Sequence, residues 1–413
     1  SCTGQSTKKQ TAESSQSGYY TESYRPQIHF SPEAHWMNDP NGLVFSNGQY
    51  HLFYQYYPDS SVWGPMHWGH AVSTDLVRWK HLPVALYPDS LGCIFSGSAV
   101  ADVNNTSGLG KDGKGPLVAM FTYHDFVGAK AGTNTFQNQA IAYSNDEGMT
   151  WTKYDHNPVV KNPGIRDFRD PKVMWHEASK KWVLTLATLN TITFFSSPDL
   201  KIWTKESEFG EGVGQHGAAW ECPDLFKLKV DGTDQEKWVL LVSINPGGPN
   251  GGSATQYFVG EFDGKVFHNE SPSPEARWMD YGKDNYAGVS WSGVPQIDGR
   301  RLLIGWMSNW QYASKVPTPV WRGAMTLPRE LSLKKLPSGE IVLNGYPTSE
   351  FDNYGPKWQD LQSQTQKFAS GSTASFALGN ADAFDYSVEL DLTAANHATI
   401  QLTNSKSEVF DIV

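Results

Sequence analysis

Three acidic residues of this chain are each followed within two residues by a proline, in similar short segments. They are Asp39 in "WMNDPNG", Asp170 in "FRDPK" and Glu221 in "WECPD". A single Asp–Pro pair is a common turn, and Asp39 taken alone is equally well explained as the cap of its own loop. Three such acids at matching places of a repeated structure are harder to explain as turns, because carboxyl groups brought together in a dry cleft repel each other. We therefore consider them as partners in one reaction.

Two neighbouring carboxyl groups with a third nearby suit the hydrolysis of a glycosidic bond. One acts as the nucleophile, and the other donates a proton and later accepts one. Asp39 follows the amide of Asn38, which predicts an ionised, hydrogen-bonded nucleophile. Glu221 lies between Trp220 and Cys222, an apolar setting that favours the protonated form that an acid needs.

The residues next to the acids predict how their side chains are aimed. Pro40 and Pro171 directly follow two of them. Because proline biases the preceding residue to extended backbone and adds no donor, we expect it to direct that acidic side chain along the strand. Arg169 adjoins Asp170, but neighbouring residues of a strand point to opposite faces, so a charge pair between the two stays open.

A repeat of strands and turns must position these acids. Ser, Asp and Trp recur in "STDLVRW" (73–79), "SNDEGMTW" (144–151) and "SSPDLKIW" (196–203), each explained as a β-turn that Asp caps and Trp supports. Strand–turn–strand units, the fifth including "GVPQIDGRRLLIGWMS" (293–308), begin near residues 39, 96, 170, 221 and 290. Periods of roughly 50 to 70 residues with about four strands each predict a five-bladed β-propeller over residues 25–345, whose innermost strands bring the acids into one funnel.

The two ends of the chain differ from this repeat. Segments such as "YSVELDL" and "ATIQLTN" alternate with period two and predict a β-sandwich over residues 346–413. A sandwich commonly needs about 100 residues, so we expect a truncated one here. Residues 1–24 begin "SCTGQSTKKQTAESSQSG", a polar stretch typical of a disordered tether. Cys2 in that context resembles the lipid-bearing residue of a bacterial lipoprotein, which predicts anchoring at the cell surface or in the periplasm; a stray cysteine is the alternative.

Composition narrows the classes of partner. The 13% aromatic content, with 38 Gly and 24 Pro, favours an all-β protein. A formal net charge of -10 opposes binding to nucleic acid or to an anionic membrane surface. No apolar run reaches the roughly 18 to 20 residues that cross a bilayer. The 3 cysteines are too few and too scattered for a disulfide framework or a zinc cluster. We expect a monomer whose partner is a neutral molecule.

With the three acidic motifs in this order, the chain resembles glycoside hydrolase family 32, the family of invertases, inulinases and levanases. Further segments agree: "FYQYYP" (53–58), "WGHAVSTDLVRW" (68–79), "FSGSAV" (95–100) and "GWMSNWQYASKVPTPVWRGAMTLPREL" (305–331). The resemblance covers residues 25–345 and implies a five-bladed propeller followed by a β-sandwich. It also implies a retaining hydrolase of β-fructofuranosidic bonds. We expect no cofactor.

The resemblance also implies a role for each acid. Asp39 would attack the anomeric carbon C2 of a fructosyl unit, Glu221 would protonate the leaving oxygen and later activate water, and Asp170 would hold fructose hydroxyls. Retention predicts a distance of about 5 to 5.5 Å between the carboxyl groups of Asp39 and Glu221. The fructose subsite would be lined by Asn38, Gln55, Trp63, Phe95, Ser96, Arg169 and Trp306. Trp63 is also compatible with simple core packing.

Several alternatives concern substrate and class. A surface tether favours an enzyme that meets polymers, and we expect an endo-levanase acting on β-2,6-linked levan; an exo-acting fructan β-fructosidase, an inulinase or an invertase is the alternative. A catalytically silent fructan-binding propeller is a rival of another class. A sialidase would fit "SNDEGMTW" but needs an arginine cluster that is not recognisable. "HWGH" (67–70) would be a poor metal site, since its two histidines would not share a strand face, and we predict metal-independent hydrolysis.

Overall fold

The computed structural model describes residues 20–271 and 273–352, together with 367, 369, 371–375, 390–392, 395 and 397–412. The chain divides into two compact units, Ser1–Tyr354 and Gly355–Val413. Cys2 and the first 19 residues of the expected tether lie outside the described residues. No helix in the described part of the chain is long and apolar enough to span a membrane.

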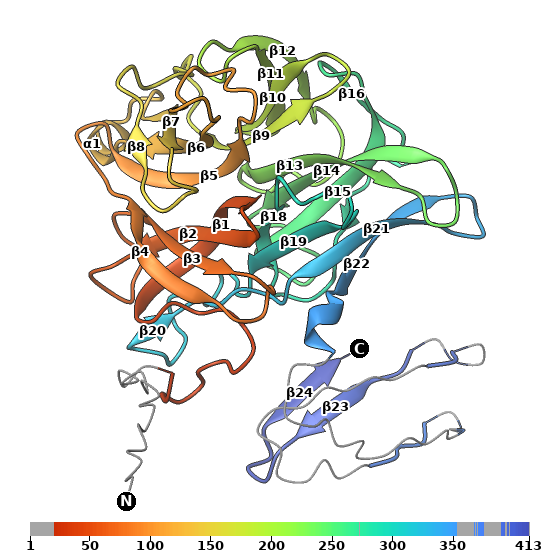
Figure 1. Ribbon diagram of the computed structural model, residues 1–413. Helices are drawn as coiled ribbons and strands as arrows, with labels where there is room; N and C mark the ends of the chain where they lie inside the picture. The colour runs from red at the N-terminus through yellow and green to blue at the C-terminus, as the bar shows by residue number, and fades with distance from the viewer. Residues whose placement is uncertain are drawn as a thin grey trace, which may run out of the picture. The chain divides into compact units, whose positions relative to one another are not determined.

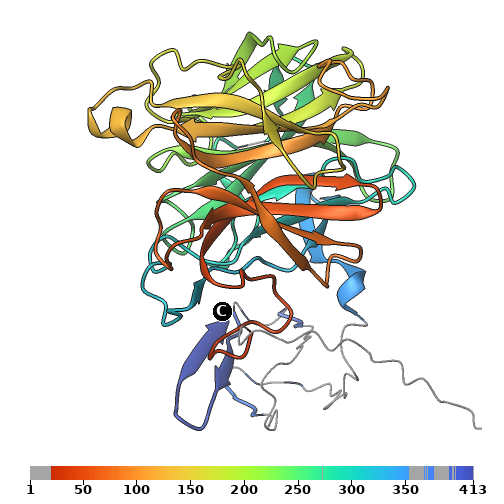
Figure 2. The same ribbon diagram turned by 60° about the vertical axis from the view of Figure 1, so that its left-hand side comes forward.

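The first unit is a five-bladed β-propeller, as predicted. Its strands form five sheets that follow one another in chain order around a ring, which the colour sequence of Figure 1 traces from red to blue. Within residues 20–352, helix is confined to α1 (Phe126–Lys130) and the 3-10 turn η1 (Ser349–Phe351). Figure 2 shows α1 as a yellow-orange turn that projects from the sheets.

The blades are built from consecutive antiparallel strands. Blade 1 contains β1 (His35–Ser46), β2 (Gln49–Tyr57), β3 (His67–Ser73) and β4 (Lys80–Leu86). Blade 2 contains β5 (Cys93–Ala101), β6 (Leu117–His124), β7 (Gln137–Ser144) and β8 (Thr152–Lys153). Blade 3 contains β9 (Phe168–His176), β10 (Lys181–Thr188), β11 (Thr191–Ser197) and β12 (Thr204–Phe209).

The last two blades follow the same plan with additions. Blade 4 contains β13 (Trp220–Lys229), β14 (Glu236–Ile244), β15 (Ala254–Phe262) and β16 (Phe267–Asn269), and β17 (Arg277–Trp278) also pairs with β15. Blade 5 contains β18 (Tyr286–Ser290), β19 (Arg301–Trp306), β21 (Arg329–Lys335) and β22 (Ile341–Pro347). The expected start of the fifth unit near residue 290 falls at the end of β18, whereas the segment 293–308 begins in a loop, with a turn at 296–298, that leads to β19.

Chain segments from the two ends of the propeller meet in blade 1. The short strand β20 (Trp321–Arg322) pairs in parallel with the start of β1, matching His35 with Trp321 and Trp36 with Arg322. The ring is therefore fastened by backbone hydrogen bonds as well as by packing.

Each blade buries both faces against its neighbours, which explains the continuous apolar runs of the strands. Leu52 packs in the cluster shared by blades 1 and 5, whereas the next residue, Phe53, packs in the cluster shared by blades 1 and 2. Leu240 and Leu241 divide in the same way between the clusters on the two sides of blade 4. No blade covers its own apolar faces, so the fold depends on the closed ring.

The three Asp-bearing turns have the structure that the sequence predicts. In the first, Asp75 Oδ1 accepts hydrogen bonds from the backbone N–H groups of Val77 and Arg78, at 3.0 and 2.7 Å. The indole of Trp79 donates to the carbonyl of Leu76 beneath the turn. The turns at Asp146 and Asp199 repeat this pattern. These turns stabilise hairpins and require no ligand.

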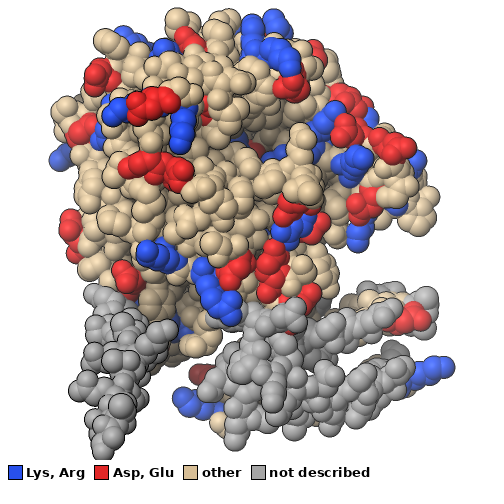
Figure 3. Space-filling model, in the orientation of Figure 1, with Lys and Arg blue, Asp and Glu red and all other residues tan. Residues whose placement is uncertain are grey.

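Charges on the face drawn in Figure 3 are mixed, with Lys and Arg interspersed among Asp and Glu.

In the second unit, the described residues include one antiparallel pair, β23 (Ile400–Thr403) with β24 (Val409–Ile412). The β-sandwich expected over residues 346–413 stays a prediction.

Candidate active site

The first strand of every blade carries a β-bulge at the same place. In each, two residues oppose one residue of the second strand, which bends the strand and re-aims its side chains. The bulged pairs are Asn38–Asp39, Phe95–Ser96, Asp170–Pro171, Cys222–Pro223 and Ala287–Gly288. These five bulges position the candidate site around the propeller axis.

The sequence led us to expect the three acids at one register position, but the structure places them at three different ones. Asp39 is the second residue of its bulge, Asp170 is the first, and Glu221 immediately precedes its bulge. The prolines suggested one common register, but Pro40 follows its bulge whereas Pro171 lies within one. The acids still converge, because the bulges turn neighbouring positions toward the same axis.

The expected effect of proline on the preceding residue is also wrong for blade 3. Asp170 precedes Pro171 with φ of 64°, in the left-handed region rather than the extended one. Cys222, which precedes Pro223, has φ of 44°. Both are first residues of bulges, and such backbone is unfavourable for residues other than glycine. The closed ring therefore maintains strained backbone directly at the carboxyl groups.

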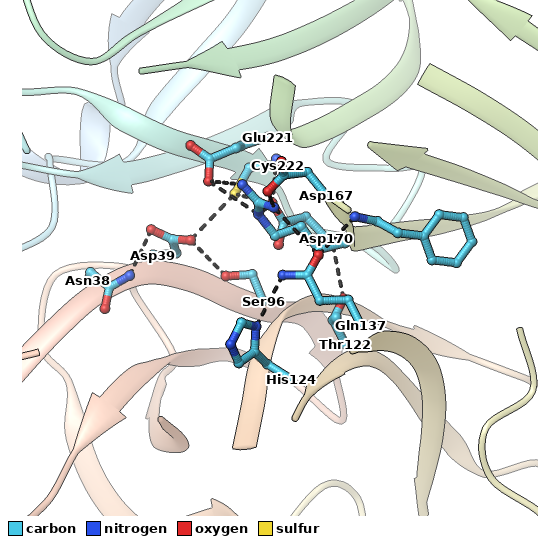
Figure 4. Close-up of polar contacts among 12 residues, drawn as sticks. Asn38, Asp39, Ser96, Thr122, His124, Gln137, Asp167, Asp170, Glu221 and Cys222 are labelled. Atoms are coloured by element: carbon cyan, nitrogen blue, oxygen red, sulfur yellow. Dashed lines mark hydrogen bonds and ion pairs between the residues drawn. The ribbon is translucent and has the colours of Figure 1, made fainter. Parts of the chain in front are cut away.

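Asp39 is held by three donors, which come from blades 1, 2 and 4 (Figure 4). Asn38 Nδ2 donates to Asp39 Oδ1 at 3.0 Å, and Ser96 Oγ donates to Oδ2 at 2.7 Å. The thiol of Cys222 contacts Oδ2 at 3.4 Å. Burial raises the pKa of Asp39 above its ordinary value, and the hydrogen bond from Ser96 opposes that shift.

Asp170 is buried beside the same thiol. Its Oδ2 accepts a hydrogen bond from the backbone N–H of Cys222 at 3.0 Å and lies 3.5 Å from Cys222 Sγ. Burial raises the pKa of Asp170 to about 7; Arg169 lowers it, while Glu221 and Asp39 raise it further. Burial also raises the pKa of the Cys222 thiol, so the sulfur keeps its hydrogen and remains a donor.

Glu221 lies in a polar setting, which corrects the apolar one expected from Trp220 and Cys222. Arg169 donates to Glu221 Oε1 through Nη2 at 2.9 Å and Nε at 3.3 Å, and the Tyr286 hydroxyl donates to Oε2. Trp220 is fully buried with its indole bound to the carbonyl of Gln215, so it packs away from the carboxyl group. Arg169 also pairs with Asp167 and lies 3.9 Å from Asp170 Oδ2.

These contacts follow the bulge register from blade to blade. Arg169, Glu221 and Tyr286 immediately precede the bulges of blades 3, 4 and 5, and Glu221 accepts hydrogen bonds from both of the others. Asp39 and Ser96 are both second residues of a bulge and are joined by a hydrogen bond. Tyr286 was missed in the sequence, because its position is recognised only from the bulge register and no proline marks the bulge of blade 5.

The remaining residues that were expected to line the subsite differ in how far they are buried. Trp63 is 39% exposed, and its ring meets the half-buried ring of Phe95 edge to face at 6.0 Å. Gln55 is buried opposite the bulge of blade 1, where its amide donates to Asn41 Oδ1 and to the carbonyl of Ile94. Asn38, Ser96 and Arg169 contact the acids directly.

Trp306 does not line the site, contrary to expectation. Its side chain is 0% exposed and packs against Trp36 and Trp310, with ring centroids at 6.3 and 4.9 Å. Trp36 in turn donates from its indole to Asn38 Oδ1 at 2.8 Å. These aromatic rings hold Asn38 through the indole of Trp36 and share a buried cluster with Tyr286. They leave Trp306 no surface for a ligand.

A buried ion pair joins two residues that directly follow the bulges of blades 3 and 4. Lys172 Nζ lies 3.2 Å from Asp224 Oδ2, and Lys172 also donates to the carbonyl of Ser290. A cavity of about 10 Å³, room for roughly one water molecule, is lined by Lys172 together with Ser96 and Asp170. The two charged residues were not singled out in the sequence, although Lys172 ends "FRDPK" and Asp224 ends "WECPD".

The two histidines of "HWGH" point to different partners, as expected for a strand. His70 is buried against His51, with His51 Nδ1 and His70 Nε2 at 3.0 Å, whereas His67 contacts the carbonyl of Pro65. They do not form a shared binding site.

Comparison with known proteins links the chain to one family. Residues 29–344 match the model described as the glycosyl hydrolases family 32 N-terminal domain. The chain is 57% identical to a levanase of Bacillus subtilis over 355 residues, covering 85% of this chain and 51% of that protein. It is 45% identical to an extracellular exo-inulinase of Aspergillus niger over 407 residues, covering 92% of this chain and 74% of that protein.

A solved structure agrees with both sequence comparisons. The exo-inulinase of Aspergillus awamori superposes with a TM-score of 0.74 at 46% identity, covering 79% of this chain and 68% of that one. The chain thus spans about half the length of the Bacillus levanase and about three quarters of the Aspergillus niger exo-inulinase.

Proposed function

The chain belongs to glycoside hydrolase family 32, and from that premise we propose that it hydrolyses β-fructofuranosidic bonds with retention of configuration. The observation that carries the proposal is the convergence of Asp39, Asp170 and Glu221 on one bulged ring of strands. Membership of this family argues against the alternative that the chain is a sialidase.

Asp39 is the proposed nucleophile. A carboxylate oxygen of Asp39 forms a bond to C2 of the fructosyl unit while the bond from C2 to the glycosidic oxygen breaks. Glu221 gives its proton to that oxygen, which leaves as a hydroxyl group. Donors from Asn38 and Ser96 favour the ionised form of Asp39 against the effect of burial.

Water completes the second step. Glu221, now ionised, takes a proton from a water molecule whose oxygen bonds to C2 as the bond to Asp39 breaks. Two inversions at C2 give net retention. Arg169 and Tyr286 hold both oxygens of Glu221, so the same carboxyl group is oriented for donating and for accepting the proton.

Asp170 is proposed to bind fructose hydroxyls as positive charge develops on the ring. Its Oδ2 already accepts the backbone N–H of Cys222, which fixes the carboxyl plane. Asn38, Gln55, Trp63, Phe95, Ser96 and Arg169 are proposed to line the subsite for the fructosyl unit. Amide, hydroxyl and guanidinium groups suit a polyol, and aromatic rings suit its apolar face.

Levan is the proposed substrate, cut within the chain. The levanase of Bacillus subtilis, at 57% identity, supports levan. Release of single fructose units from chain ends is the second candidate, which the exo-inulinase of Aspergillus niger favours at 45% identity.

We propose that the enzyme works outside the cytoplasm as a monomer, in line with the extracellular exo-inulinase that it resembles. A lipid on Cys2 remains part of the proposal. Palmitate-analogue labelling that persists after Cys2→Ala would contradict that anchor.

The test is sugar release from levan, inulin and sucrose by the wild type and by Glu221→Gln. We expect wild-type activity that is lost by several orders of magnitude in the variant. Glu270→Gln is the matched control, because Glu270 pairs with Lys237 outside the site and should leave activity unchanged. Equal activity in wild type and Glu221→Gln would overturn the assignment, and binding of levan without hydrolysis would indicate the silent propeller.

A further inference from the structure

An aromatic wall extends outward from the nucleophile between blades 1 and 2. It consists of Trp63, Phe95, His124 and Phe126. Phe95 directly precedes Ser96 and stacks on His124 at 4.2 Å with an interplanar angle of 14°. Phe126, in α1, meets His124 at 4.6 Å and Trp63 at 5.8 Å. The rings therefore form one continuous surface from the residue beside Ser96 to the projecting turn of α1.

The outer half of this wall is open to solvent. Trp63 is 39% exposed and Phe126 is 37% exposed, while the inner rings of Phe95 and His124 are more covered. Their neighbours in sequence are also apolar and exposed: Val62 is 51% exposed and Val127 is 79% exposed. Large apolar groups gathered beside a catalytic site and left open are typical of a surface that a ligand covers.

The wall lies away from the acid that serves the leaving group. Glu221 is on blade 4 and is held by Arg169 of blade 3 and Tyr286 of blade 5. The wall comes from blades 1 and 2, and Figure 4 shows Glu221 and His124 on opposite sides of Ser96. Because Glu221 must touch the glycosidic oxygen, the leaving sugar lies on its side. The wall then faces the opposite end of the fructosyl unit that is cleaved.

We infer that Phe126, with the exposed edge of Trp63, binds the fructosyl unit next to the cleaved one, on the side away from the leaving group. The inference rests on the proposed function and deepens it. A ring edge packed against Phe95 and His124 presents a rigid apolar surface to the C–H groups of a sugar at little cost in side-chain entropy. A chain that occupies this position continues past both sides of the cleaved bond, which is the geometry of cutting within a polymer.

The experiment compares two substrates that differ at this position. Sucrose has glucose on the leaving side of its one fructosyl unit and no sugar on the other side, whereas an internal unit of levan has neighbours on both. For Phe126→Ala, we expect the ratio of kcat/KM on levan to kcat/KM on sucrose to fall about tenfold. Phe126→Tyr keeps the ring and should keep the ratio near its wild-type value.

The control is Ile202→Ala, which removes an apolar group that is 68% exposed. Ile202 lies in the turn between β11 and β12, at the end of blade 3 that is away from Arg169 and Asp170. It should change neither rate. An equal loss on both substrates, or no loss with Phe126→Ala, would overturn the inference, and so would a wild type that releases only fructose from levan. Failure of the proposed function has a different signature, namely a folded wild type that cleaves no β-fructoside at all.

Discussion

The hydroxyl of Tyr286 donates its hydrogen to Oε2 of Glu221, although the two residues are 65 positions apart and belong to different blades. Together with Arg169 on Oε1, it leaves the carboxyl group one orientation. Burial keeps the phenol protonated by raising the pKa of Tyr286 well above its usual range, so it remains a donor at any working pH.

Tyr286→Phe should therefore lower kcat while the ring continues to fill its place. A hydrogen bond to a charged group contributes about 1.5 to 3 kcal/mol, so we expect a loss of roughly 10- to 100-fold in kcat with little change in KM. Tyr123→Phe is the matched control, because Tyr123 is also buried and donates to a carboxylate, Asp89, outside the site. Similar kinetics for the two variants would refute a positioning role for Tyr286.

Ser96→Ala tests the donor to Asp39, the proposed nucleophile, in the same way. Loss of the 2.7 Å hydrogen bond to Asp39 should reduce kcat/KM by roughly 10- to 100-fold. Ser98 is on the same strand and donates to the carbonyl of Pro171 at 2.9 Å. Ser98→Ala should lower the melting temperature more than it lowers kcat/KM, and the opposite ranking would count against the assignment of Ser96.

Asp170 predicts a pH-dependent cost to stability. The native chain keeps a proton on Asp170 up to about pH 7, whereas the unfolded chain releases it near the ordinary value of 3.8. The native state therefore binds more protons between these values, and the free energy of unfolding falls as the pH rises through them. Asp170→Asn should be inactive yet melt at a higher temperature than wild type at pH 8. That advantage should disappear toward pH 4, and a constant difference in melting temperature would contradict the predicted titration.

The buried histidine pair predicts the opposite dependence elsewhere in the fold. Burial lowers the pKa of His51 from 6.5 to about 4 and lowers that of His70 well below its ordinary value. The unfolded chain then binds more protons below pH 6.5, so stability falls as the pH decreases from that value. Between pH 7 and pH 5, the free energy of unfolding of His70→Gln should fall by about 2 kcal/mol less than that of the wild type. Denaturant unfolding at the two pH values measures this difference. His268→Gln, at an exposed position of β16, serves as the control; an unchanged pH dependence in His70→Gln would refute the assignment.

The architecture and the family could be predicted from sequence because both rest on local patterns. The Asp-capped turns around Asp75, Asp146 and Asp199 are short-range features, and the alternating apolar runs reveal strands that are buried on both faces. The motifs around Asp39, Asp170 and Glu221 identify the acids themselves. These features need no knowledge of how the blades meet.

The geometry of the site could not be predicted, because it depends on bulges. One extra residue shifts every later side chain of a strand to the other face, and no residue type announces where that shift occurs. Aligning the motifs on proline hid the equivalence of Arg169, Glu221 and Tyr286, which the structure shows. Trp306 was misplaced for a similar reason: its strand is known from sequence, but its face is decided by the bulge opposite Gly305.

The most direct measurement of the central claim is a search for the covalent intermediate. Fructosyl fluoride needs no proton donor for its leaving group, so Glu221→Gln should form the fructosyl-enzyme and hydrolyse it slowly. Peptide mass spectrometry after rapid quenching should find one fructosyl unit, attached at Asp39. Fluoride release without a label at Asp39, or with inversion at C2, would contradict the account.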